Sequence, residues 1–208
     1  MNCILCEGPT KKFWKSKNRE FVECSNCGGI QLLPKFYVSK IAEEARYLTH
    51  NNDVEDSRYQ DFVNPITSRV LKDFSTKHKG LDYGCGTGPV ATTELEKEGY
   101  TVALYDPYFH PNTEVLKAKY DFIICCEVME HFYEPKREFS ELAALLHLGG
   151  KLYCKTSIYS AEINFDHWYY KNDATHVFFY TAKSLEWIKD NLGFSALEIH
   201  PKVIVFGK

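Results

Sequence analysis

The chain has 208 residues, of which 44% are hydrophobic, and a formal net charge of −3. This size and composition suit one ordinary domain with a small appendage. No run of residues reaches the roughly 18 apolar positions needed to span a bilayer, and the N-terminal MNCILCEGPT lacks the charged and apolar regions of a signal peptide. We therefore expect a soluble, cytoplasmic protein with no membrane partner, in which disulfides are not favoured.

Two Cys-x-x-Cys pairs stand near the start of the chain, Cys3 with Cys6 and Cys24 with Cys27, with seventeen residues between the pairs. This spacing is typical of a four-cysteine zinc site, and four thiolates leave no open position for chemistry. A redox dithiol is the alternative, but two pairs this far apart favour a tetrahedral metal. We predict that residues 1–36 form a zinc ribbon with a structural zinc, too small to fold without it.

The N-terminal segment is also more basic than the rest of the chain. Residues 1–40 carry seven basic and three acidic side chains, and Phe13, Trp14 and Phe21 lie among them. Cations suit phosphate groups and aromatic rings suit stacked bases, so this segment could contact RNA. A solvated surface accounts for the same charges, and both interpretations stay open here.

Residues 37–78 are predicted to form a helical linker or lid. Apolar residues recur at helical spacing in two stretches, at Ile41, Ala45 and Leu48 and again at Phe62, Ile66, Val70 and Phe74. We expect two helices, with Pro65 near the start of the second. The polar break THNNDVEDS at residues 49–57 is either a capped loop or part of a wall over an active site.

From residue 79 to residue 208 the pattern alternates between strands and helices. Strands are predicted at 80–84, 101–106, 121–128 and 151–157, helices at 89–98, 135–147 and 181–191, and two further strands on either side of Pro201. The 121–128 stretch is apolar throughout, as expected for a parallel strand buried on both faces. The order predicts an α/β fold with a mostly parallel sheet and a terminal hairpin.

A glycine-rich loop follows the first of these strands. Gly84, Gly86 and Gly88 stand at its carboxyl end, where ligands of such sheets bind and where glycine lets the backbone approach them closely. Asp106 ends the second strand, and an acidic residue there can accept hydrogen bonds from both ribose hydroxyls. The dinucleotide fingerprint G-x-G-x-x-G fails, because Pro89 stands in place of its last glycine.

The alternative pattern D-x-G-x-G-x-G is satisfied by Asp82 and the three glycines. It resembles motif I of the class I S-adenosylmethionine (SAM) dependent methyltransferases. EVMEHFYEP at residues 127–135 and LHLGGKLY at residues 146–153 are similar to segments of the same superfamily. The resemblance, which covers residues 75–208, implies a Rossmann-like seven-stranded sheet ordered 3-2-1-4-5-7-6. Only fourteen residues separate Asp106 from Asp121, so we expect strand 3 to be short or missing.

The resemblance also implies where SAM lies. Asp82 and Gly84 would be near its methionine part, Asp106 would bind the ribose, and Cys126 and Glu127 would line the methionine and ribose side. Gly86 and Gly88 belong to the same loop. No residue can be carried over for the adenine ring, which Tyr108 or Phe109 could cover.

SAM carries an activated methyl group, so the protein must mainly align the acceptor for in-line displacement and sometimes remove a proton. Two places hold candidate bases: Glu130-His131, and the segment after the 151–157 strand, which includes Asp173 and His176. His131 and His176 are the predicted general bases, because a neutral imidazole is available at pH 7. A structural role is the alternative for both, and Asp173 either orients His176 or caps a turn.

Three functions are compatible with this sequence. The first is a SAM-dependent methyltransferase for a small molecule, in which the ribbon supports or closes the active site. The alternative is an RNA methyltransferase whose ribbon reads the substrate. A non-catalytic SAM-binding protein is a third, which the intact motif I disfavours.

Overall fold

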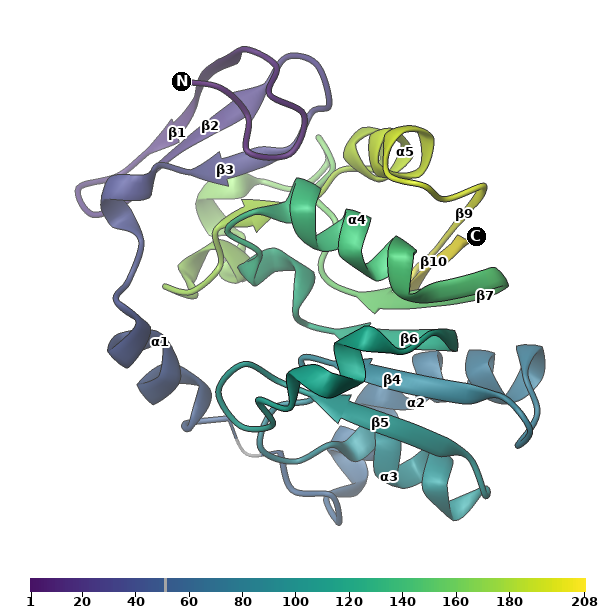
Figure 1. Cartoon of the computed structure of the whole chain (residues 1–208). Coiled ribbons are helices and arrows are strands. Elements are labelled where there is room, and N and C mark those ends of the chain that lie inside the picture. Colours follow the sequence, from purple (N-terminus) through teal and green to yellow (C-terminus); the bar gives the residue numbers. More distant parts are fainter. Residues whose placement is uncertain (51) are drawn as a thin grey trace.

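The computed structural model describes residues 1–50 and 52–208, and its largest element is a six-stranded sheet. The strands are β4 (Lys79–Tyr83), β5 (Thr101–Tyr105), β6 (Tyr120–Cys126), β7 (Leu146–Lys155), β9 (Ala196–His200) and β10 (Val203–Gly207). Their order is β5-β4-β6-β7-β10-β9 (Figure 1). The first four are parallel, whereas β10 runs antiparallel to both β7 and β9. The expected α/β fold and terminal hairpin are confirmed.

The sheet of the described residues has six strands and not seven. Between β5 and β6 the chain forms the 3-10 helix η2 (Thr113–Lys117), and β5 is an edge strand. Because a parallel crossover needs a dozen or more residues, the fourteen between Asp106 and Asp121 cannot hold both a strand and its crossovers. The third strand is therefore missing from the part of the chain that the structure describes.

Helices cover both faces of this sheet (Figure 1). One layer holds α2 (Ser57–Asp73) and α3 (Val90–Lys97), and the other holds α4 (Pro135–Leu145) and α5 (Ala182–Asn191). Phe122 and Ile124 of β6 pack with the first pair, while Ile123 and Cys125 pack with the second. Successive side chains of a strand point to opposite faces, so this apolar strand is buried on both sides, as predicted.

Most element ends differ from the sequence prediction by one or two residues, and two boundaries differ by more. Helix α2 begins at Ser57, because the side chain of Asp56 accepts a hydrogen bond from the Arg58 N–H and caps it, so Pro65 lies inside the helix and not near its start. Strand β7 begins at Leu146, directly after α4. The sequence predicted a helix to residue 147 and a strand from residue 151, but residues 146–150 belong to β7, whose register to β6 shifts between Tyr120 and Phe122.

A second, smaller sheet contains the N-terminal segment. Its order is β1 (Thr10–Lys15), β2 (Glu20–Cys24), β3 (Ile30–Leu32) and β8 (Phe178–Phe179), all antiparallel. Strand β8 comes from the segment after β7, so that segment completes the sheet of the ribbon. A side chain at Gly29 would place its Cβ 2.2 Å from the Phe178 ring, which explains why the chain has glycine there.

An aromatic cluster holds this junction together. Phe21 of β2 and Phe179 of β8 pack with Phe165 and Trp168 of the intervening segment, and all four are buried. Phe165 lies in the 3-10 helix η4 (Phe165–His167). The ribbon and the segment after β7 thus share one hydrophobic core.

No helix in the described residues is both long enough and apolar enough to cross a membrane.

We predict that Phe179→Ala lowers the free energy of unfolding by about 3–5 kcal/mol, because it leaves a cavity in this aromatic core. Denaturant unfolding followed by tryptophan fluorescence measures the change. Tyr169→Ala is the matched control, since Tyr169 is 73% exposed, and should change stability by less than about 0.5 kcal/mol. Equal losses in the two variants would contradict the importance of this junction.

Candidate active site

A cavity of about 1590 Å³ opens at the carboxyl ends of β4, β5 and β6. Every residue predicted to bind SAM or act as a base lines it: Asp82, Gly84, Gly86, Gly88, Asp106, Cys126, Glu127, His131 and His176. Small-molecule sites usually measure roughly 300–1,000 Å³. The cavity therefore has room for a nucleoside cofactor and a second ligand.

The glycine loop between β4 and α3 has the backbone that the sequence suggested. Gly84 and Gly86 have φ angles of 80° and 66°, a region that side chains disfavour. A Cβ on Gly84 would lie 2.5 Å from Val128 Cγ2, and one on Gly88 would lie 1.8 Å from the backbone oxygen of Asn52. The residues before α2 therefore pack directly on the loop.

Asp106 fixes this loop to the end of β5. Its Oδ2 accepts a hydrogen bond from the Gly86 N–H at 3.1 Å, and its Oδ1 accepts from the N–H groups of Tyr108 and Phe109 at 2.8 and 3.0 Å. These contacts hold a carboxylate at the edge of the cavity, as a ribose-binding residue requires. Tyr108 and Phe109 themselves line the cavity.

Asp82 lies beneath the same loop. It is buried and accepts a hydrogen bond from Thr92 Oγ1 at 2.8 Å. Burial, with the nearby charge of Asp106, raises the pKa of Asp82 to about 7. Cys126, at the end of β6, has a pKa raised mainly by burial, so its thiol is protonated and lines the cavity as a neutral group.

Helix α1 (Lys40–Tyr47) forms one wall of the cavity. The sequence predicted a helical linker or lid in this region but not which side chains would form the wall. Glu43 is buried there and accepts hydrogen bonds from the hydroxyls of Tyr47, Tyr108 and Tyr133 at 2.7, 2.9 and 3.2 Å. Burial raises the pKa of Tyr47 and Tyr108, and the Glu43 charge adds to this effect. The sequence did not indicate Glu43, because two of its three partners, Tyr108 and Tyr133, come from distant parts of the chain.

The other side of α1 is held by an ion pair. Arg46 Nη2 lies 2.6 Å from Asp173 Oδ2, and its Nε lies 3.1 Å from the same oxygen. Asp173 also accepts hydrogen bonds from the N–H and hydroxyl of Thr175, and its pKa is low despite partial burial. Asp173 thus joins α1 to the segment after β7 and makes no hydrogen bond to the ring of His176.

His176 lies beside Glu130 and His131, although it comes from a distant part of the sequence. Glu130 and His131 lie in the 3-10 helix η3 (Met129–His131), and the Nε2 atoms of both histidines lie 4.0 Å from Glu130 Oε1. The two imidazole rings are 4.8 Å apart between centroids. Burial lowers the pKa of His131 to about 3 and that of His176 to about 4, so both rings are neutral at pH 7.

Tyr170 links Glu130 to Glu127. Its hydroxyl lies 2.9 Å from Glu127 Oε2 and also donates toward Glu130 Oε1. Glu127 has a φ of 54°, a left-handed conformation that turns the chain after β6. Burial raises the pKa of Glu127 and, more strongly, that of Glu130, where the Glu127 charge adds to the effect.

The ribbon holds the residues around His176 in place. Arg19, in the turn between β1 and β2, donates hydrogen bonds to the backbone oxygens of Lys171, Asp173 and His176. Lys171 lies in the 3-10 helix η5 (Tyr169–Asn172). The guanidinium thus satisfies three carbonyl groups of one short segment beside the cavity.

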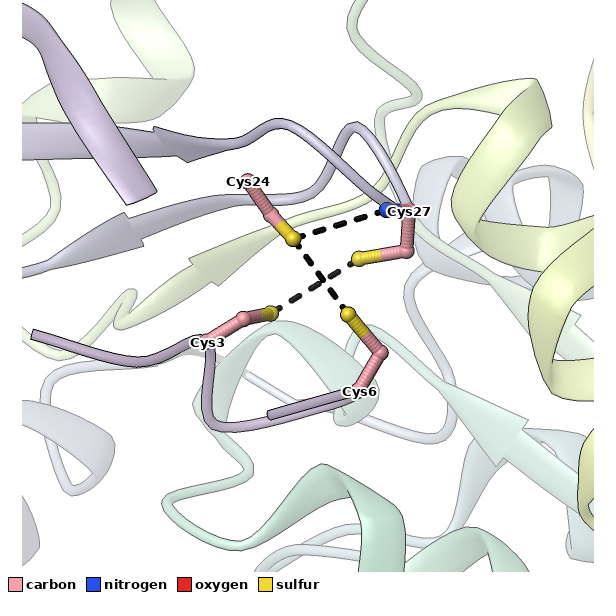
Figure 2. Close-up of side chains that lie close together, drawn as sticks. All are labelled: Cys3, Cys6, Cys24 and Cys27. Carbon is pink, nitrogen blue, oxygen red and sulfur yellow. Dashed lines mark hydrogen bonds between the residues drawn. The ribbon is translucent and has the colours of Figure 1, made fainter. Parts of the chain in front are cut away.

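The four N-terminal cysteines form a cluster apart from the cavity. Figure 2 shows their sulfur atoms pointing toward one another. The Cys3 and Cys27 sulfurs are 3.6 Å apart, the Cys6 and Cys24 sulfurs 3.3 Å, and all four lie within 4.8 Å of one another. Zinc–sulfur bonds of 2.3 Å in a tetrahedron place the sulfurs about 3.8 Å apart. The cluster is therefore compatible with a zinc site.

Solved structures of methyltransferases share this architecture. The 1,6-didemethyltoxoflavin-N1-methyltransferase of Burkholderia thailandensis, solved with 1,6-didemethyltoxoflavin and S-adenosylhomocysteine, superposes with a TM-score of 0.56 at 12% identity, over 94% of this chain and 97% of its own. Human N-acetylserotonin methyltransferase, solved with SAM, has a TM-score of 0.53 at 12% identity, over 96% and 79%. At these identities the likeness shows the fold.

The sequence itself carries the family relationship. No curated protein sequence is significantly similar to the chain. A family profile described as a methyltransferase domain matches residues 56–199, which include the glycine loop, Asp106 and the Glu130 cluster. Since this match covers well over half of the chain, the protein belongs to the methyltransferase domain family.

Proposed function

We propose that the protein transfers a methyl group from SAM to a small-molecule acceptor. The observation that carries this proposal is the cavity, in which the glycine loop and the Glu130 cluster line one space large enough for two ligands. Helix α1 walls this space through Glu43 and Arg46, which favours a compact acceptor. The structural neighbours from B. thailandensis and human are named for small acceptors.

SAM would bind beside the glycine loop, where the backbone has no side chains in the way and a carboxylate lies next to it. Gly84, Gly86 and Gly88 leave backbone exposed to the cavity, and Asp106 stands beside them with two carboxylate oxygens. Cys126 and Glu127 complete this side of the cavity. When bound, SAM would supply a methyl group on a positively charged sulfur, which an acceptor's lone pair would displace in line. The bonding pair leaves with the sulfur.

The histidine base has weaker support than the binding site. General bases work best when their pKa lies near the operating pH, and burial holds the pKa of His131 and His176 far below it. Alignment of the two ligands is therefore the main contribution that we propose for the protein. A base role for His131 or His176 stays a prediction.

RNA as the acceptor is the less favoured alternative. Three basic side chains of the ribbon, Lys11, Lys15 and Lys35, form ion pairs with Glu23 or Glu20. The aromatic residues that could stack on bases are used in packing: Phe21 is fully buried, and Phe13 and Trp14 pack against its cluster. These three lysines and three aromatic rings are thus engaged in contacts within the protein, which disfavours a role in binding RNA.

We also propose a structural zinc in the four-cysteine cluster. Burial raises the pKa of Cys24, while hydrogen bonds to its Sγ from the N–H groups of Cys27 and Asn26, at 3.4 and 3.3 Å, act in the opposite direction. The neighbouring Cys27 thiol lowers the pKa of Cys3 to about 6. Four sulfur ligands would close the coordination sphere, so the metal would act in folding and not in methyl transfer.

The acceptor class can be found by incubating the purified protein with methyl-labelled SAM and a cell extract, then separating RNA, protein and small molecules. We expect the label in the small-molecule fraction, because α1 walls the cavity. Label confined to RNA would favour the alternative, and transfer of no label would contradict methyl transfer altogether.

Asp106→Ala should weaken SAM binding by about 1–3 kcal/mol, since a charged acceptor is lost from the ribose side and from the Gly86 N–H. Isothermal titration calorimetry measures this change. Asp121→Ala is the matched control, because Asp121 also accepts a backbone hydrogen bond, from the Lys79 N–H at 2.8 Å, but does not line the cavity. Unchanged affinity in Asp106→Ala would refute the assignment.

Cys24→Ser should lose zinc and destabilise the ribbon, because the hydroxyl is a poor substitute for a thiolate ligand. Elemental analysis of the purified protein measures the metal. Cys154→Ser is the control, since Cys154 is a buried cysteine of β7 outside the cluster, and should keep one zinc per chain. A full zinc content in Cys24→Ser would exclude the four-cysteine site.

A further inference from the structure

Three donor side chains converge at the wall of the cavity, well apart from the four cysteines. Ligand atoms of Glu130, His131 and His176 all lie within 4.8 Å of one another. In an octahedral cation with bonds of about 2.1 Å, adjacent ligand atoms lie roughly 3 Å apart and opposite ones roughly 4.2 Å. The observed distances of 4.0 Å from each Nε2 to Glu130 Oε1 therefore need only small side-chain movements to surround one ion.

The hydrogen bonds of the His131 and His176 rings leave the Nε2 atom of each free to bind a metal ion. His131 Nδ1 lies 3.1 Å from the backbone oxygen of Thr175, and His176 Nδ1 lies 2.9 Å from that of Tyr170. A carbonyl oxygen only accepts, so each Nδ1 carries the proton and each Nε2 has a free lone pair near Glu130. Histidines that bind metals commonly donate their other N–H to a carbonyl in this way.

The carboxyl group of Glu130 lacks hydrogen-bond partners for one of its oxygens among the described residues. Its side chain is fully buried, and its Oε2 has no hydrogen-bond partner among residues 1–50 and 52–208. The Tyr170 hydroxyl contacts both Glu130 and Glu127, but its single proton can serve only one of them. In the described residues, the groups within ion-pair distance of Glu130 are the two neutral histidines. Burial without a cationic partner disfavours the ionised form of Glu130, and a cation bound beside it would stabilise the carboxylate.

We propose that Glu130, His131 and His176 bind a divalent first-row transition-metal ion such as Mn²⁺. Two imidazoles and one carboxylate suit such ions and leave coordination positions open for other ligands. The ion would supply the charge that Glu130 lacks. It differs from the proposed structural zinc in its ligands, its place in the fold and its open coordination.

The open positions suggest how such an ion would be used. The three donors line the same cavity as the glycine loop, so an oxygen atom of the methyl acceptor can coordinate there. We expect acceptors with a hydroxyl or carboxylate oxygen near the methylated atom to bind best. This use rests on the proposed function, whereas binding of the ion does not.

Binding is tested by titrating the purified full-length protein with Mn²⁺ in the absence of SAM, with free Mn²⁺ measured by electron paramagnetic resonance. Mn²⁺ prefers oxygen and imidazole to thiolate, so the cysteine cluster does not compete for it. We expect one site per chain in the wild type and at least a tenfold weaker site in Glu130→Gln and in His176→Gln. Both variants are checked for folding by circular dichroism.

Glu198→Gln is the matched control. Glu198 also lies beside a histidine, His200, at 2.9 Å, but on the exposed surface of β9, and its replacement should leave Mn²⁺ binding unchanged. An absence of Mn²⁺ binding in the wild type, or equal affinity in wild type and both folded variants, would overturn the proposal.

SAM binding by calorimetry separates this inference from the proposed function. SAM affinity is measured in the wild type, in which the glycine loop and Asp106 provide the proposed SAM site. Mn²⁺ binding without SAM binding would support the metal site and contradict the methyltransferase. SAM binding and methyl transfer with no Mn²⁺ site would support the methyltransferase and contradict the metal site.

Discussion

The backbone of Val177 joins the N-terminal ribbon, residues 1–36, to the candidate active site. Its N–H donates to the carbonyl oxygen of Glu130 at 2.9 Å, and its own carbonyl accepts from the N–H of Leu32 at 2.9 Å. One residue thus connects the last strand of the ribbon with the turn after β6. Arg19 reinforces the connection by binding three carbonyl groups around His176. The position of His176 beside Glu130 therefore depends on a folded ribbon.

This dependence gives the ribbon a role that needs no contact with a substrate. Lys11 and Lys15 pair with Glu23 and Glu20 within the ribbon. Its aromatic residues pack in a core shared with the segment after β7, and that segment supplies the fourth strand of its sheet. A metal that holds the ribbon together would hold one wall of the cavity indirectly. Such an arrangement fits support of an active site better than recognition of a nucleic acid.

The electrostatics of the cavity divide it into two parts. Around the glycine loop, Asp106 is satisfied by three backbone N–H groups, so this part is organised before any ligand arrives. Around Glu130, two acidic side chains share one phenol; Lys155 lies 4.0 Å from Glu127 Oε1, whereas the groups at that distance from Glu130 among the described residues are neutral imidazoles. The first part resembles a finished binding site, and the second resembles a site whose partner must come from outside the chain.

Much of the fold could be read from local patterns. Alternating strands and helices, the apolar run of β6 and the three glycines each follow from contacts along a short stretch of chain, and the structure confirms them. The spacing of the four cysteines likewise indicated their cluster. Boundaries were less secure where a single cap or a shift of register decided them, as at Asp56 and at Leu146.

By itself, the sequence determined the order of the elements, the glycine loop after β4 and the clustering of the four cysteines, because these depend on local spacing and on burial patterns. Only the tertiary structure decided that α1 closes the cavity through Glu43, that β8 completes the ribbon, and that His176 meets Glu130. These contacts join residues more than 40 positions apart, and no periodicity along the chain encodes them. They arise because packing of the two sheets brings distant loops to one edge, where burial and charge then select the partners.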